Sequence, residues 1–132
     1  MTQRLLILLI LAAFITTSTA AHGKDLVRKF TGSRSTETID FEVRSPWLLD
    51  WWVNGEYPQM VGLEVSLIDA KTGQHAGYVL KTKHPSNGVR LFDQSGRFRL
   101  KIDATMSNWI LKVEQLTRKE AELYTPVDKT SF

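Results

Sequence analysis

One stretch, RFRLKID at residues 97–103, alternates charged and apolar side chains without a break. Successive side chains of a β-strand point to opposite faces of a sheet, whereas a helix would spread these charges around its axis. The stretch therefore predicts a half-buried strand that presents one face to a hydrophobic core.

The same period of two continues through most of the chain. Ile39, Phe41 and Val43 share one predicted face, and so do Trp47, Leu49, Trp51 and Val53. The pattern predicts strands at residues 27–31, 37–44, 47–54, 61–69, 75–82, 88–93, 97–103 and 108–116. Several short strands with one apolar face each indicate an all-β fold of about seven to eight strands. We expect a two-sheet antiparallel β-sandwich, jelly-roll-like, with a small closed barrel as the alternative.

Turn residues separate the predicted strands. Residues 70–73 (AKTG) predict a hairpin loop, and Pro85-Ser86-Asn87-Gly88 predicts another turn. Residues 94–96 (QSG) are expected to close a hairpin between the strands on either side of them. The spacing of Thr117 and Glu120 predicts a helix N-terminus, with helix over residues 119–124 and its end at Pro126.

The first twenty residues read as a secretory signal peptide. Arg4 precedes an apolar run of eleven residues, and Ser18-Thr19-Ala20 fits a cleavage site for small residues. Cleavage after Ala20 or after Ala21 fits this pattern. We expect residues 1–20 to be the signal peptide, 21–35 a flexible segment and the first strand, 36–116 the sandwich, and 117–132 a short helix and tail. The protein is then periplasmic or extracellular, with no membrane span.

Composition excludes several classes of protein. The 132 residues contain no cysteine, which rules out disulfides, thiolate metal sites and a cysteine nucleophile. Removing Arg4 from the 17 basic residues leaves sixteen against 14 acidic residues, a net charge of +2. That balance is too weak to predict a nucleic-acid partner. The folded chain must rely on its hydrophobic core.

Two groups of residues are candidates for ligand binding. Trp52 lies on the polar side of its strand beside Asp50 and near Tyr57, and an exposed indole there would stack on a sugar ring or anchor a partner protein. Arg97, Arg99 and Lys101 share an outward face. If the 94–96 hairpin forms, Arg90 joins them, and Lys112 extends a patch suited to an anionic ligand.

Two alternatives depend on other residues. If cleavage follows Ala21, His22 becomes the N-terminal residue and would chelate copper through its amine and imidazole, with His75 or His84 completing the site. Asp50 and Glu64 form the best carboxylate pair for a small hydrolase. The sequence otherwise lacks the usual nucleophile, phosphate-loop and dinucleotide motifs of enzymes, and we expect no cofactor.

The segment from Thr36 to Gln115 resembles small exported bacterial β-sandwich domains of uncharacterised function. The resemblance rests on an opening threonine strand, the mid-chain tryptophans at 47–51 and the final strand at 109–113. It implies a jelly-roll or CUB-like sandwich, although CUB domains usually carry disulfides. These are packing motifs, so they transfer no site residues. We expect a non-enzymatic binding module for a cell-envelope glycan, a protein or an anionic surface.

Overall fold

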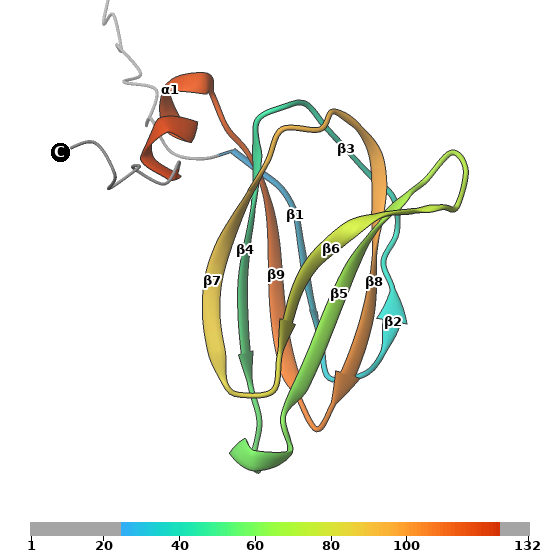
Figure 1. Ribbon diagram of the computed structural model, residues 1–132, viewed down its shortest axis with the longest axis vertical. Helices are drawn as coiled ribbons and strands as arrows, with labels where there is room; N and C mark the ends of the chain where they lie inside the picture. The colour runs from blue at the N-terminus through green and yellow to red at the C-terminus, as the bar shows by residue number, and fades with distance from the viewer. Residues whose placement is uncertain (1–24, 125–132) are drawn as a thin grey trace, which may run out of the picture.

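The computed structural model describes residues 25–124, which form two β-sheets packed face to face (Figure 1). The strands are β1 (Asp25–Gly32), β2 (Thr36–Glu37), β3 (Phe41–Val43), β4 (Trp47–Asn54), β5 (Gly62–Asp69), β6 (His75–Thr82), β7 (Ser86–Phe92), β8 (Gly96–Thr105) and β9 (Asn108–Gln115). The short helices are η1 (Pro58–Met60), α1 (Arg118–Ala121) and η2 (Glu122–Tyr124). The predicted antiparallel sandwich with a short C-terminal helix is confirmed.

The chain crosses repeatedly between the two sheets. The four-stranded sheet has the order β1-β9-β4-β7, and the five-stranded sheet has the order β2-β8-β5-β6, with β3 also paired to β8. Within residues 25–124, β5 and β6 are the only consecutive strands that pair with each other. The two central strands of the four-stranded sheet, β4 and β9, therefore come from distant parts of the sequence.

The core lies between the sheets and is centred on Trp47. Its indole stacks on Phe92 with the ring centroids 4.2 Å apart, and Phe41 meets it edge-on at 5.8 Å. The indole N–H donates a hydrogen bond to the backbone oxygen of Gln94 at 2.8 Å, so the buried ring leaves no polar atom without a partner. Trp109 is also buried in this core, as the alternating pattern predicts.

The prediction of a turn at Asn87-Gly88 is wrong, because both residues lie inside β7. Gly88 faces Trp51 of β4, and a Cβ atom on Gly88 would lie only 2.7 Å from Cζ2 of that indole. Trp51 is half-buried against the core, on the face predicted for it. The glycine therefore leaves room for an indole ring instead of making a turn.

The connection at residues 94–96 is also different from the prediction. It joins β7 in one sheet to β8 in the other, so these strands do not form a hairpin. The hairpin predicted at residues 70–73 is confirmed: β5 pairs with β6, and Gly73 has a φ of 71°. Glycine adopts that left-handed conformation without steric cost.

The segment predicted as one strand over residues 37–44 forms the separate strands β2 and β3. Between them, the Thr38 hydroxyl accepts a hydrogen bond from the Leu100 N–H at 3.0 Å. A side chain that replaces a backbone partner interrupts the regular pleat. Ile39, which was predicted to face the core, is therefore 62% exposed. At the N-terminal end, β1 already pairs with β9 from Asp25, so the sandwich begins before residue 36.

A second, smaller apolar cluster lies on the outer face of the four-stranded sheet. Leu48 alternates with the core-facing residues Trp47 and Leu49 and so lies on the outer face of β4, yet it is fully buried against Leu116 and Ala121 at the C-terminal helix. The predicted capping box is confirmed, because the Thr117 hydroxyl and the Glu120 carboxylate each accept a hydrogen bond from the other's backbone N–H at 3.1 Å. The predicted helix end at Pro126 lies outside the described residues.

The helices of residues 25–124 are all too short or too polar to cross a membrane.

Candidate functional site

The outer face of the four-stranded sheet carries the exposed Trp52 beyond the Leu48 cluster. Trp52 is 40% exposed on β4 and lies opposite Ile110 of β9 on one side and Asn87 of β7 on the other. A depression of about 300 Å³ is lined by Trp52, Ile110, Lys29, Asp50 and Lys112, together with Trp51, which packs against the core. We call the first five of these residues the Trp52 face.

The strand register places the charged members of the Trp52 face in one row. Lys112 on β9 lies opposite Lys29 of β1 on one side and Asp50 of β4 on the other. Neighbouring strands are about 4.8 Å apart, so this row of ammonium and carboxylate groups runs across three strands beside the indole. The row offers hydrogen-bond donors and acceptors next to an apolar ring.

Four of the five residues of the Trp52 face lie on the two interior strands of the sheet, and Lys29 lies on the edge strand β1. β9 and β4 are both interior strands, and each pairs with neighbours along most of its length. A site on such strands keeps its side chains in place better than a site on a loop. A ligand would therefore meet a preformed surface.

Tyr57 is exposed but does not belong to the Trp52 face. It is 50% exposed and precedes η1, at the end of the sandwich where β4 passes toward β5 (Figure 1). It does not line the depression beside Trp52. The predicted proximity of the two aromatic side chains followed their spacing in the sequence, but the chain leaves the sheet after Asn54.

Arg90 was predicted to join a basic patch, and this prediction is wrong. It lies opposite Leu49 in the register, on the inward side of the edge strand β7. Its Nη1 donates a hydrogen bond to the backbone oxygen of Val79 in β6 at 3.0 Å, and its guanidinium lies 5.4 Å from the centre of the Phe92 ring. Arg90 therefore connects the edges of the two sheets.

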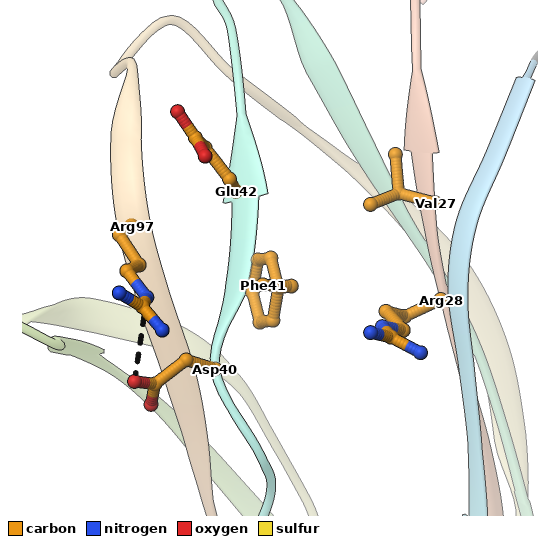
Figure 2. Close-up of a pocket in the computed structure, with 6 residues that line it drawn as sticks. All are labelled: Val27, Arg28, Asp40, Phe41, Glu42 and Arg97. Atoms are coloured by element: carbon orange, nitrogen blue, oxygen red, sulfur yellow. Dashed lines mark ion pairs between the residues drawn. The ribbon is translucent and has the colours of Figure 1, made fainter.

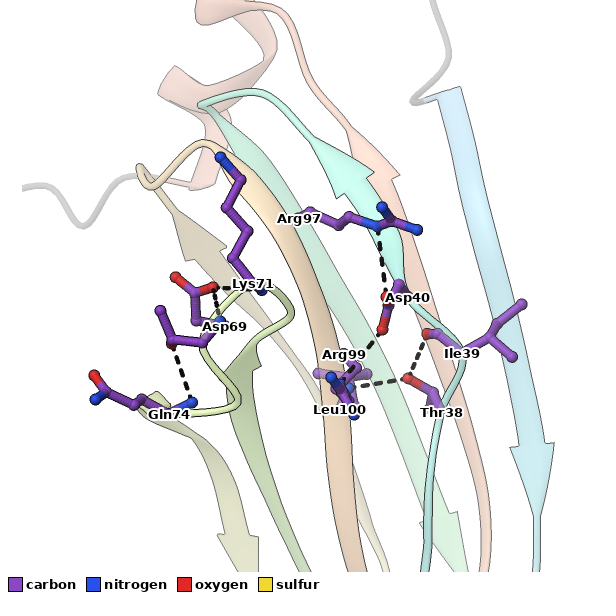
Figure 3. A network of polar contacts seen from close by, with 10 residues as sticks. Thr38, Ile39, Asp40, Asp69, Lys71, Gln74, Arg97, Arg99 and Leu100 are labelled. Carbon is purple, nitrogen blue, oxygen red and sulfur yellow. Dashed lines mark hydrogen bonds and ion pairs between the residues drawn. The ribbon is translucent and has the colours of Figure 1, made fainter.

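The remaining residues of the predicted basic patch do face outward on β8, but acidic neighbours surround them. Asp40 forms ion pairs with Arg97 at 3.5 Å and with Arg99 at 3.4 Å (Figure 3). Glu37 lies opposite Lys101 in the register. The predicted association with Lys112 does not occur either, because that lysine is in the other sheet. The proposed patch is split and locally neutralised.

A second depression, of about 400 Å³, opens between β1 and β3 (Figure 2). Arg28 and Arg97 border it, and so do the carboxylates Asp40 and Glu42, over the core residue Phe41. Two guanidinium groups thus face two carboxylates, and Asp40 is already paired with Arg97. This balance gives the depression no preference for a ligand of either charge.

The structure bears on the two alternative sites, the copper site at His22 and the carboxylate pair of Asp50 and Glu64. His22 lies outside the described residues, and residues 25–124 contain no cluster of three or more metal-ligating side chains. His75 is the first residue of β6 and His84 follows the end of that strand, so roughly 23 Å of extended chain separates them and they do not meet. Asp50 and Glu64 lie on opposite outer faces of the sandwich, because Asp50 lines the Trp52 depression and Glu64 pairs with Lys81 on the other sheet.

Sequence reasoning found Trp52 and Asp50 but missed Lys29 and Ile110. Both lie on strands that the sequence predicts, at outward positions, but only the pairing of β1 and β4 with β9 brings them beside Trp52. No model of a known protein family and no curated protein matches the chain.

Proposed function

We propose that this protein is an exported, non-enzymatic module that binds a glycan of the cell envelope on the Trp52 face. The observation that carries the proposal is an exposed indole on rigid interior strands, with polar side chains in the adjoining row. An indole offers an apolar surface for the C–H face of a sugar ring. Asp50, Lys112 and Asn87 supply acceptors and donors for the hydroxyl groups around that ring.

The same features favour a sugar over a protein partner. Binding centres between proteins are desolvated by a surrounding ring of contacts and are depleted of charge. Beside Trp52, by contrast, three of the four residues in the adjoining row of the sheet are charged, namely Lys29, Lys112 and Asp50, and the fourth is Val89. Such a mixed surface suits a ligand that is itself apolar on one face and polar at its edges.

We further propose that the sandwich is a jelly roll, as the resemblance to CUB-like exported domains implies. The strand order β1-β9-β4-β7 against β2-β8-β5-β6 supports this, because the first strand pairs with the last and each half of the chain alternates between the sheets. Jelly rolls occur among lectin domains. This likeness of fold raises the expectation of glycan binding but does not carry it.

The signal peptide predicted at residues 1–20 supports export to the periplasm or the exterior. In that location the domain would meet envelope glycans directly. The lack of cysteine is compatible with a fold held by its core alone.

Binding of the secreted protein to an array of neutral and acidic envelope-type glycans tests the proposal. We expect at least one glycan to bind wild type, and Trp52→Ala to weaken that binding about tenfold or more. Tyr78→Ala is the matched control, because Tyr78 is an aromatic residue that is 62% exposed on the other sheet. Absence of any glycan binding, or equal binding by Trp52→Ala, would overturn the proposal.

A further inference from the structure

We infer that the glycan bound on the Trp52 face carries an anionic group, which Lys29 and Lys112 hold beside the indole. This inference rests on the proposed function, and it names the class of sugar that the face selects.

The two lysines form a like-charged pair across neighbouring strands. Lys29 on β1 and Lys112 on β9 are direct partners in the register, and both line the depression beside Trp52. Directly opposed side chains have their Cβ atoms about 5 Å apart, and like charges in such positions repel each other. An anion placed between the two ammonium groups would relieve that repulsion.

Several cations on the outer face of the five-stranded sheet form ion pairs, although Lys101 on that face forms none within residues 25–124. On the five-stranded sheet, Arg97 and Arg99 share Asp40. Lys81 pairs with Glu64 at 3.9 Å. Within residues 25–124, neither Lys29 nor Lys112 has a carboxylate within ion-pair distance.

The exposed charge of the Trp52 face is therefore positive. Asp50 is the one carboxylate that lines the depression, against two lysines. Glu114 is two residues from Lys112 on the same side of β9, but it is buried. The face thus offers a ligand one more cationic than anionic group, which favours an anion by charge complementarity.

The positions of the lysines relative to the indole fit a sugar with a charged substituent. Trp52 and Lys112 are diagonal neighbours across β4 and β9, about 7–8 Å apart at the backbone. A ring stacked on Trp52 would direct a substituent along the sheet toward Lys112, and Lys29 lies one strand further on. The lysine ammonium is a point charge on a flexible stem and imposes no fixed geometry on its partner. Either a carboxylate or a phosphate on the sugar would therefore fit between the two lysines.

A matched set of polymers tests the inference on the full secreted chain. Polygalacturonate supplies sugar carboxylates, and its methyl ester has the same backbone with those charges removed. A phosphate-bearing mannan and an unphosphorylated mannan form the second pair. We expect wild type to bind at least one charged polymer about tenfold more tightly than its neutral counterpart. Which pair shows this difference distinguishes carboxylate from phosphate.

Two double variants separate a local effect from net charge. Lys29→Gln/Lys112→Gln should abolish the preference for the charged polymer and reduce the dependence of binding on salt. Lys71→Gln/Lys101→Gln changes the net charge equally at exposed positions away from the Trp52 face, and it should keep the preference.

The outcomes for the inference and for the proposed function are distinct. If the neutral polymers bind as tightly as the charged ones and Trp52→Ala weakens both, the glycan site stands and the inference is overturned. Equal loss of preference in both double variants also overturns it. If no polymer binds, or Trp52→Ala binds like wild type, the proposed function fails and the inference with it.

Discussion

Replacing Gly88 by alanine tests whether the packed indole of Trp51 requires a glycine at this position of β7. The nearest atoms to a new Cβ are Cζ2 of Trp51 at 2.7 Å and Cε2 of the same ring at 3.0 Å. Alanine restricts the unfolded chain and would by itself stabilise the protein by about 0.4–1 kcal/mol. Moving the packed indole costs about 1–3 kcal/mol. The clash outweighs the gain, so we expect Gly88→Ala to lower the free energy of unfolding.

Urea unfolding of the secreted protein measures this difference, and thermal unfolding should show a drop of about 4–8 °C for each kcal/mol lost. Trp51→Phe supplies the control, because a phenyl ring lacks the indole atoms nearest to Gly88. In the Trp51→Phe background, Gly88→Ala should be neutral or slightly stabilising. An alanine penalty of the same size in both backgrounds would refute the explanation, since the cost would then arise from the backbone.

Three further predictions concern other parts of the molecule. Arg90→Ala removes the hydrogen bond to Val79 and the contact with Phe92, so it should lower the free energy of unfolding, measured by urea unfolding, by about 1 kcal/mol. Glycan binding by this variant should be unchanged. Leu48→Ala leaves a cavity under the C-terminal helix and should cost about 2–5 kcal/mol, whereas Val89→Ala, at an exposed position on the same face, should be nearly neutral. Intact-mass measurement of the secreted protein should show a chain that begins at Ala21 or at His22.

Each of these predictions has an outcome that contradicts it. Loss of glycan binding by a folded Arg90→Ala protein would contradict the conclusion that Arg90 has only a structural role. Equal stability of the Leu48→Ala and Val89→Ala proteins would mean that the outer cluster does not hold the helix. Secreted protein that retains residues 1–20 would contradict the signal peptide. A chain beginning at Ala21 would contradict the copper hypothesis, because His22 would then lack the terminal amine that chelation requires.

The alternating pattern alone predicts most of the strands, because a side-chain period of two is a local property. It places Trp47 and Trp109 in the core and Trp52 on the outside, as the structure does. The capping box at Thr117 is equally local, since its two hydrogen bonds join residues three apart. These features needed no knowledge of which strands pair.

Pairing between strands that are distant in the sequence decided which side chains become neighbours. Arg90 lies at an apparently polar position of its strand and remains exposed, yet the register with Leu49 points it toward the other sheet, where its guanidinium bridges the two sheet edges. The arginines of β8 seemed to form a patch until the fold brought Asp40 between them. Lys29 and Lys112 are far apart in the sequence and meet beside Trp52 only because β1 and β4 both pair with β9. Alternation determines which face of a strand a side chain occupies, whereas its neighbours on that face depend on long-range pairing that no local pattern encodes.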